Sequence, residues 1–446
     1  MIKKNITLGP LSNPLVLIGA GVAILFGRLA LVPDLSASIP LVVGISGIIV
    51  ILLALGQYWG THGKRAESPI FIITMAALFR IMFLWQPPVL SDDIYRYLFD
   101  GLMMIQGNNP YAIAPLDAQN IGPVMKALVP LINHNHIPTI YPPGAQVVFA
   151  AGAALGSVTG PVLGMKLMLF SMDMGTCVLI LILLRTLGRP LYPLILYAWN
   201  PLPVLEIAGS GHIDGAALLF FLASLVLSIQ NRSSFLCGLF MGFSVVTKWV
   251  PLIFFPTWLL MVGKERRLTA LLSFSITILA LSLPFFPEMI NGFVTLGNYL
   301  RHWEFSGFIF RSIRELTGSG MVSRLLVATV FAGIIGTLFI RQSATKRSSE
   351  DAMIFLLIIS SAYLVLSPTV YPWYAIYLAG FLPFTPTPGG LVFTWSLMLS
   401  YGVLITLAAT GQWAENGMTS LMIISAPGAA VLATTLLGML KRTPQR

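Results

Sequence analysis

Charged side chains are scarce in this sequence. Asp, Glu, Lys and Arg make up 9% of its 446 residues and 56% are hydrophobic, whereas a soluble globular protein carries roughly 25% charged residues. A soluble core cannot hide so much apolar surface. Apolar stretches of about 20 residues recur, each long enough to cross a hydrocarbon layer as a helix. The period-two alternation of an outer-membrane barrel is absent, so we expect an all-α polytopic membrane protein.

Cysteine is nearly absent. Cys177 and Cys237 lie in apolar runs, which predicts small buried side chains and gives no disulfide framework. The net charge of +10 does not indicate nucleic acid as a partner, because the basic residues are scattered at the ends of apolar stretches. The positive-inside rule of membrane proteins explains that distribution better. The first stretch, 11–32, has no small-residue cleavage site, so we interpret it as a retained helix and not as a signal peptide.

The basic clusters predict a topology, because an even number of spans separates any two cytoplasmic clusters. They are Lys3–Lys4, Lys64–Arg65, Lys264 with Arg266–Arg267, Arg341 with Lys346–Arg347, and Lys441–Arg442. Parity and helix length predict about 11 to 13 spans in a single transmembrane domain, 1–446. The count fails only where Arg189 is expected inside and His212 outside. A re-entrant or broken helix between about 141 and 211 would make the number of spans agree with both placements.

Residues 87–143 form the longest segment without a span and are expected to be an external loop. Within it, apolar residues recur at helical spacing from Asp93 to Gln106, with Ser91 as a candidate cap and Gly107 at the end. The apolar face comprises Ile94, Tyr97, Leu98, Gly101, Leu102 and Ile105. This pattern predicts an amphipathic juxtamembrane helix lying along the membrane surface.

This helix also carries the densest group of ionisable residues, Asp92, Asp93, Arg96 and Asp100, together with Tyr97. Spacings of three and four residues place Arg96 beside one of the first two aspartates and beside Asp100. Two interpretations stand side by side. The group is either a solvated helix start with local ion pairs or part of a functional site. Charge runs usually lie at a solvated surface, but because charges are scarce elsewhere in the chain, the two interpretations are equally well supported.

Further polar residues fall at the expected outer ends of spans. Lys248 is notable because both of its flanks are apolar, although a lysine can also extend to the membrane interface. His212 and Asp214 alone do not make a metal site, and we expect none. The other polar or aromatic members of this set that are candidates for binding are Tyr141, Arg301, His302, Tyr371 and Tyr374. Cations, carboxylates and aromatic rings together suit a ligand with a phosphate, a sugar and a lipid tail.

Several motifs resemble polyprenol-phosphate-sugar-dependent glycosyltransferases of the C-type (GT-C) fold, most closely the bacterial mannosyltransferase-like branch. The first is Ser91-Asp92-Asp93-Ile94-Tyr95-Arg96-Tyr97, followed by Gly107-Asn108-Asn109-Pro110-Tyr111. The others are Tyr141-Pro142-Pro143, Trp199-Asn200-Pro201, Gly209-Ser210-Gly211-His212 with Asp214-Gly215, Lys248-Trp249-Val250-Pro251, and 367–374 with Tyr371-Pro372-Trp373-Tyr374. They follow the family order across most of the chain, although the spans after about Phe384 add nothing.

The resemblance implies an inverting transfer of a sugar, mannose foremost, from a polyprenyl-phosphate-linked donor to a hydroxyl of a glycan or lipid-linked acceptor. The site would face outward from a bacterial plasma membrane. By position, Asp93 is the first candidate for the general base and Asp92 the second. Arg96 would orient the carboxylate or hold the donor phosphate, and Asp214 would contact a sugar hydroxyl. Candidates for the phosphate are Lys248, His212, Arg301, His302 and Tyr371, while Tyr97, Tyr141 and Tyr374 complete the expected donor-binding set. No cofactor is implied, and metal dependence stays open.

Two other functions remain. A transporter or flippase for lipids or lipid-linked sugars also has many helices and intramembrane charges, but its charges would lie near the midplane and its halves often repeat. Here the charges gather at one face and no repeat is visible. A binding or assembly subunit without activity is the other alternative. Sugar transfer with Asp93 and Asp92 variants separates these functions.

Overall fold

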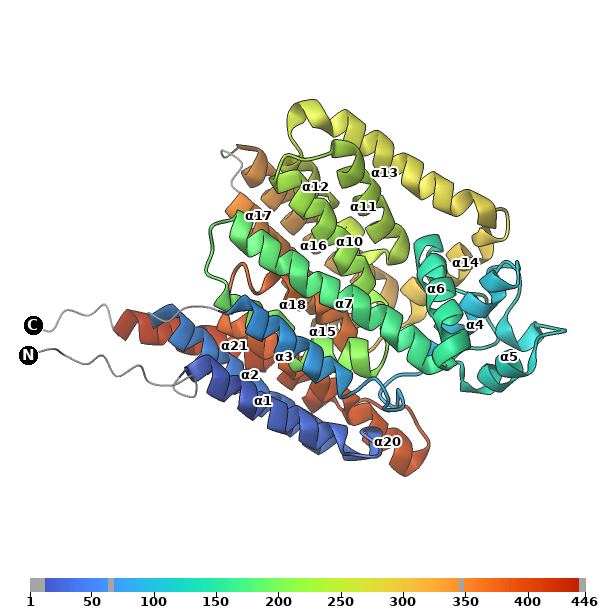
Figure 1. Cartoon of the computed structure of the whole chain (residues 1–446), viewed down its shortest axis with the longest axis horizontal. Coiled ribbons are helices and arrows are strands. Elements are labelled where there is room, and N and C mark those ends of the chain that lie inside the picture. The colour runs from blue at the N-terminus through green and yellow to red at the C-terminus, as the bar shows by residue number, and fades with distance from the viewer. Residues whose placement is uncertain (1–12, 63–67, 345–348, 441–446) are drawn as a thin grey trace, which may run out of the picture.

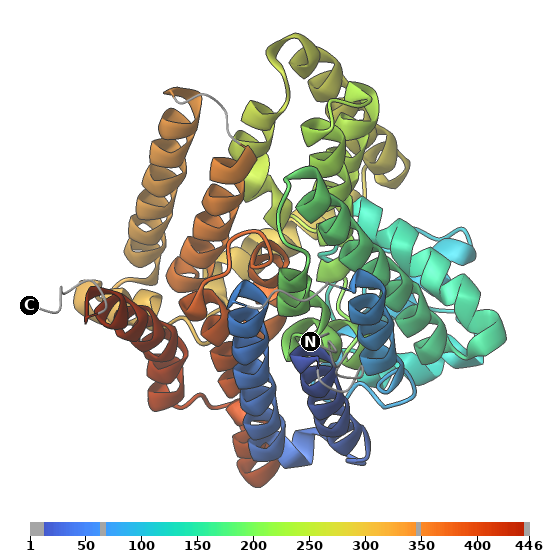
Figure 2. The same cartoon turned by 60° about the vertical axis from the view of Figure 1, so that its left-hand side comes forward.

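The predicted all-α fold is confirmed. The computed structural model describes residues 13–62, 68–344 and 349–440, and within these ranges every named element is helical, with only isolated bridges between 305–306 and Thr369 as extended pairing. Figures 1 and 2 show a bundle in which the first helices (blue) lie beside the last ones (red). One contact between them is the hydrogen bond from Trp395 Nε1 to the carbonyl of Val43, at 2.9 Å. The amino-terminal and carboxy-terminal parts therefore form one body.

Seven helices of the described residues are long and apolar enough to cross a membrane. They are 36–62, which contains α2 (Ile39–His62), α7 (Pro161–Thr186), 264–285, which contains α13 (Arg267–Ser282), α16 (Gly320–Ala344), α17 (Ser349–Leu366), 388–410, which joins α19 (Pro388–Ser396) to α20 (Gly402–Thr410), and 417–436 within α21 (Gly417–Leu440). Five shorter apolar helices accompany them: α1 (Pro14–Ala30), α3 (Pro69–Ile81), α6 (Pro143–Thr159), α11 (Ser234–Thr247) and 250–261, which contains α12 (Phe255–Met261). The polytopic class is thus established, while the number of 11 to 13 spans stays a prediction.

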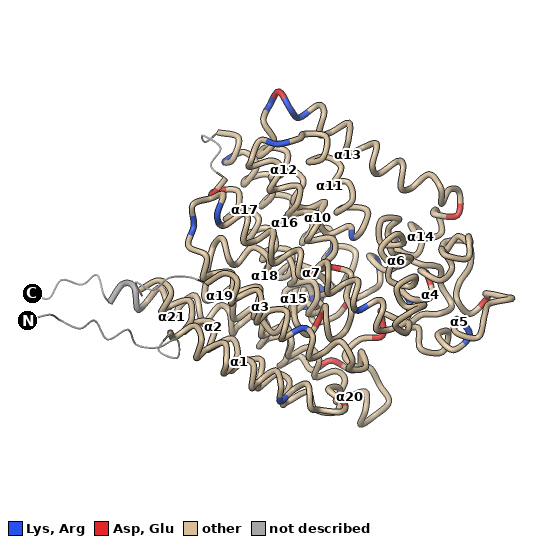
Figure 3. Tube along the Cα trace, viewed as in Figure 1, with Lys and Arg blue, Asp and Glu red and all other residues tan. Residues whose placement is uncertain are grey.

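Lys and Arg residues gather at one end of the bundle, with a few acidic residues among them, as Figure 3 shows near the starts of α13 and α17. Side-chain contacts join the turns at this end to one another. Arg189 pairs with Glu350 at 3.1 Å, and Arg266 Nη1 donates to Asn231 Oδ1 at 3.1 Å. Arg189 therefore lies at the same end as the turns before α13 and α17. Four predicted basic clusters, Lys3–Lys4, Lys64–Arg65, Lys346–Arg347 and Lys441–Arg442, lie outside the described residues.

A break in the middle of the chain closes the topology that simple counting left open. Residues 192–209 run away from the Arg189 end, and α10 (Asp214–Ile229) returns at an angle of 118°. Asn200 caps the helical restart at Pro201, because its side chain accepts from the amide of Leu202 at 3.0 Å. Below the restart, buried Arg80 donates to the carbonyl of Ala198 at 2.7 Å and pairs with Asp173. The bend places 210–213 at the end opposite to Arg189.

The predicted loop helix exists as α4 (Asp93–Ile105) and packs against α6 at the end of the bundle where α5 (Pro123–Leu128) also lies (Figure 1). Gly107, with φ +75°, follows its end as expected. The predicted face is buried at Ile94, Tyr97, Leu98 and Gly101, but Ile105 is 51% exposed. Arg96, Phe99 and Asp100 are buried as well. The helix is therefore covered on more of its circumference than a helix resting on a membrane surface would be.

Candidate active site

Four ionisable residues from three separate parts of the chain lie close together. Asp93 begins α4, His212 lies in the break, Asp214 begins α10, and Lys248 follows the end of α11. Asp214 and His212 are fully buried, while the side chains of Lys248 and Asp93 are 16% and 27% exposed. We call these four residues the Asp93 cluster. The structure thus brings together residues that lie up to 155 positions apart in the sequence.

Gly211 explains how α4 approaches the break so closely. Its φ of +82° is a conformation that glycine adopts without a steric cost. A Cβ atom at this position would lie 2.5 Å from Cδ1 of Ile94, which is impossibly close. The missing side chain therefore lets Ile94 pack directly on the break. Because Asp93 precedes Ile94, this contact also sets the position of the carboxylate.

The carboxylate of Asp93 lies in a pocket of hydroxyls and one imidazole. Tyr97 donates to its Oδ2 at 3.4 Å, and Nδ1 of His212 lies 3.6 Å from the same atom. Burial raises the pKa of Asp93 above its ordinary value, and the charge of Lys248 and the hydroxyls of Tyr141 and Tyr97 oppose that rise. A carboxylate with a raised pKa that still reaches solvent has the properties of a general base.

Asp92 has a different environment from Asp93. It precedes the helix, and its side chain makes no capping hydrogen bond. Instead, the hydroxyl of Ser91 accepts from the amide of Asp93 at 3.3 Å, so the predicted cap is present in that form. Burial, followed by the charge of Asp93, raises the pKa of Asp92 to about 6. The protonation state of one of these neighbouring carboxyl groups therefore affects the pKa of the other.

Lys248 is the cation of the Asp93 cluster. Its Nζ lies 3.2 Å from Oδ2 of Asp214, and it faces the rings of Tyr141 at 5.5 Å and Tyr374 at 5.8 Å. Ring faces attract a cation, so the ammonium group is held by one carboxylate and two aromatic rings. The other oxygen of Asp214, Oδ1, is buried without a hydrogen-bond partner among the described residues. The pair therefore keeps unsatisfied hydrogen-bonding capacity inside the protein.

Stacked rings support the imidazole of His212. Trp373 stacks on it at 3.9 Å and is itself stacked on Tyr371 at 4.5 Å, which stacks on Phe305 at 4.5 Å. Tyr374, on the same turn as Trp373, bonds through its hydroxyl to that of Tyr299 at 2.7 Å. Tyr371 is therefore connected to the Asp93 cluster through Trp373, which stacks on His212. Tyr374 contacts the cluster directly, because its ring faces Lys248. We call the four rings Phe305, Tyr371, Trp373 and His212 the ring stack.

Glu206 is a site residue that the sequence analysis missed. It lies on a π-helical turn, Val204–Gly209, and its Oε2 is 3.4 Å from Nε2 of His212. Tyr401 donates to its other oxygen at 2.7 Å. A lone acid in an apolar run is a usual sign of function in a membrane protein, and π-helical turns often occur at sites. That signal was present at Glu206 in the sequence, but the residue lay between two motifs.

Three predicted site residues lie apart from the Asp93 cluster. Arg96 turns toward its own helix, where Nε bonds Oδ1 of Asp100 at 2.8 Å and Nη1 donates to the carbonyl of Ile137 at 3.0 Å. Arg301 and His302 are exposed at the end of α14 (Met289–His302). They line a separate cavity of about 380 Å³ with Glu304, Arg314 and Arg324. The predicted contact of Arg96 with the Asp93 carboxylate is therefore not made.

No group of three or more His, Cys, Asp or Glu side chains within 13–62, 68–344 and 349–440 is arranged to hold a metal ion. His212 lies between two carboxylates, but neither of its ring nitrogens has a hydrogen bond among the described residues. The Asp93 cluster therefore offers two carboxyl groups, a half-buried ammonium group and an imidazole as its chemical groups.

A family model described as alpha-(1->6)-mannopyranosyltransferase, N-terminal domain, matches residues 12–264. The chain belongs to this family. The match covers more than half of the 446 residues and includes every member of the Asp93 cluster as well as Glu206. The predicted resemblance to bacterial mannosyltransferases of the GT-C type is confirmed, and the protein is a membrane glycosyltransferase. Neither the curated proteins nor the solved structures contain a match.

Proposed function

We propose that the protein is an inverting mannosyltransferase that uses a polyprenyl-phosphate-linked mannose on the extracytoplasmic side of a bacterial plasma membrane. The observation that carries this proposal is the Asp93 cluster itself. It places a partly exposed carboxylate of raised pKa beside a half-buried cation, in a chain of the mannopyranosyltransferase family.

Two groups of the cluster, Asp93 and Lys248, have a step in the transfer. Asp93 accepts the proton of an acceptor hydroxyl, and the oxygen attacks the anomeric carbon from the face opposite to the phosphate. The bond between that carbon and the phosphate oxygen breaks, and the polyprenyl phosphate leaves as an anion. Lys248 lies where it can stabilise the growing negative charge. A glycosidase would need a second carboxylic acid to protonate its leaving group, but a phosphate leaves without one.

The depth of the cluster fits a lipid-linked donor. α10 and α11 have 16 and 14 residues and run from the basic end to the cluster. At 1.5 Å per residue they span roughly 20–25 Å, less than the roughly 30 Å of a hydrocarbon layer. If the basic end is cytoplasmic, the cluster therefore lies somewhat below the outer surface, at the level a membrane-anchored phosphate can reach.

Sugar transfer by the purified protein tests the proposal. With polyprenyl-phosphate β-mannose as donor and an alkyl mannoside as acceptor, we expect transfer with an α-linked product. Because inversion exchanges the two anomers, the corresponding α-linked donor should be inert. Asp93→Asn should lower the rate by about 10²–10⁴-fold, the usual contribution of a general base.

The control variant is Asp117→Asn, in the same external segment but away from the Asp93 cluster. It should transfer at the wild-type rate. Undiminished transfer by Asp93→Asn would contradict the assignment of the base. Lipid movement without transfer from either anomer of the donor would favour the flippase.

A further inference from the structure

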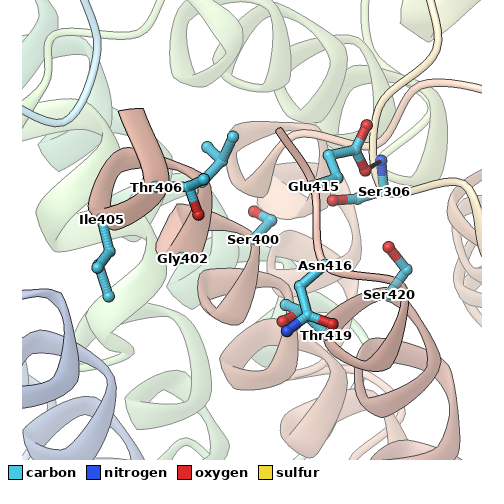
Figure 4. Close-up of a pocket in the computed structure, with 10 residues that line it drawn as sticks. Ser306, Ser400, Gly402, Ile405, Thr406, Glu415, Asn416, Thr419 and Ser420 are labelled. Atoms are coloured by element: carbon cyan, nitrogen blue, oxygen red, sulfur yellow. Dashed lines mark hydrogen bonds between the residues drawn. The ribbon is translucent and has the colours of Figure 1, made fainter. Parts of the chain in front are cut away.

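A second polar cavity lies between the last two helices and the loop after α14, outside the residues that the family model matches. It measures about 280 Å³, close to the lower limit of roughly 300 Å³ for small-molecule sites. Figure 4 shows its walls. They are Ser306, Ser400, Gly402, Val403, Ile405, Thr406, Glu415, Asn416, Thr419 and Ser420. We call it the hairpin pocket, because most of it comes from the hairpin of α20 and α21.

The hairpin pocket is lined by hydroxyl groups and contains no Lys, Arg or His side chain. The side chains of Thr406, Thr419 and Ser420 make no hydrogen bond to the described protein. Ser400, in contrast, donates to the carbonyl of Leu397 at 2.7 Å. Free hydroxyls can both donate and accept, which matches the hydroxyls of a neutral polyol. A phosphate or another anion would meet no cation in the wall.

One carboxylate in the wall is fixed in place. Glu415 Oε2 accepts from the amide of Ser306 at 2.6 Å and from Arg311 at 2.8 Å (Figure 4). Arg311 does not line the cavity, and its guanidinium group pairs with Glu415. The other oxygen, Oε1, has no hydrogen bond to the described protein and is available as an acceptor. A positioned carboxylate among hydroxyls is a common partner of sugar hydroxyls.

An exposed indole lies next to Glu415 in the loop. Trp413 is 52% exposed, and its ring lies 5.6 Å from that of Phe305 at an interplanar angle of 43°. An indole of which about half is exposed offers apolar ring surface to a ligand. The C–H face of a sugar ring fits such a surface, while its hydroxyls need groups like those of the hairpin pocket.

The hairpin pocket is linked to the Asp93 cluster through the ring stack. Ser306 lines the pocket, and its neighbour Phe305 is the outer ring of the stack. The inner ring, His212, lies beside Asp93. Three ring contacts, with centroid distances of 3.9 to 4.5 Å, thus connect Phe305 to the imidazole of His212.

We propose that the hairpin pocket is a subsite for the acceptor glycan. It holds a sugar residue distant from the reacting hydroxyl, with Trp413 against its C–H face and Glu415, Thr406 and Thr419 at its hydroxyls. The inference rests on the proposed function, because it assumes that the acceptor is a glycan. The occupant is a neutral sugar because the wall of the cavity has hydrogen-bonding groups and no cation.

Binding of α-(1→6)-linked mannotriose, measured by titration calorimetry on the detergent-purified full chain, tests the subsite without depending on transfer. Trp413→Ala and the double variant Thr406→Val with Thr419→Val should each weaken binding about tenfold, the effect of one aromatic contact or one to two hydrogen bonds. Matched controls are Trp85→Ala, an indole 70% exposed at the end of α3, and Thr435→Val, an exposed threonine on α21.

The outcomes separate the subsite from the proposed function. Unchanged binding in both pocket variants, or equal losses in the controls, would overturn the subsite. Absence of binding by the wild type, while mannose is still transferred to an alkyl mannoside, would also overturn it and leave the function intact. Pocket-dependent binding in a protein that transfers no mannose would support the subsite and refute the function.

Discussion

Two polar regions at the same end of the bundle differ in how they hold their cations. In the Asp93 cluster, Lys248 is 16% exposed and is enclosed by Asp214 and two tyrosine rings. Arg301 lines an open cavity together with two other arginines, Arg314 and Arg324. Both of these pair with Glu304, and Arg324 also donates a hydrogen bond to the carbonyl of Trp303. The first region pairs Lys248 with a fully buried carboxylate, while the second has a partly exposed carboxylate, Glu304, and exposed side chains at Arg301 and His302.

This difference decides which cation can act on a phosphate in a reaction. Electrostatic stabilisation of a transition state is strong where water is excluded and the charges are already in place. Exposed cations attract an anion at longer range but are screened by salt. The sequence analysis named Lys248 first among the candidates for the phosphate and placed Arg301 and His302 after it. The structure places Lys248 in the Asp93 cluster and the other two in the separate cavity, so the proposed mechanism assigns the phosphate to Lys248.

The largest expected effect within this comparison concerns Lys248. Lys248→Met keeps the length of the side chain but removes the charge, so transfer should fall by about 10²–10³-fold, the loss seen when a preorganised charge-stabilising group is removed. The variant also leaves Asp214 buried without its partner, which costs stability. The double variant Lys248→Met with Asp214→Asn should recover the thermal stability but not the activity. Recovery of both would assign Lys248 a purely structural role.

A smaller loss is expected at Glu206, behind the imidazole. Glu206→Gln keeps the contact with Tyr401 but removes the charge near Nε2 of His212. We expect kcat to fall about tenfold, or roughly 1.4 kcal/mol, because the polar environment of the imidazole changes. Steady-state kinetics should show the loss in kcat, with KM for the donor unchanged. A change in KM alone would place Glu206 in binding.

The exposed region should tolerate substitution better than the buried one. Arg301→Gln or His302→Gln should reduce kcat/KM for the lipid-linked donor by about two- to fivefold, in keeping with screened surface charges of up to about 1 kcal/mol. The reduction should disappear at high salt. A loss as large as that of Lys248→Met, unaffected by salt, would move the phosphate site to the open cavity.

The smallest effect concerns the pH dependence of transfer. A base must be ionised, so activity should fall as the pH is lowered through the raised pKa of Asp93. Asp92→Asn removes a neighbouring negative charge and should therefore shift the acidic limb of the kcat/KM profile to lower pH, by less than one unit. Loss of activity at every pH would instead make Asp92 the base.

Much of the site could be predicted because its motifs are local. The sequence placed the helix start at Asp93, the glycine before His212, and the isolated Lys248 at ends of spans. It could not assign partners, since spacing allowed Arg96 to pair with Asp93 as well as with Asp100. The structure selects Asp100 because Thr139 and Gln146 also face that carboxyl group. Trp373 was visible in its motif, but its stacking on His212 depends on how distant helices pack.

Composition and periodicity by themselves determined that the chain is helical and membrane-bound, because an apolar backbone in lipid has almost no other way to satisfy its hydrogen bonds. The residues of α4 and the end of that helix at Gly107 were likewise a local matter of propensity and glycine geometry. Only the tertiary structure decided which charges meet. The 118° bend at 210–213, the close approach allowed by Gly211, and the burial of Glu206 arise from packing between distant segments. Sequence spacing carries no information about such contacts.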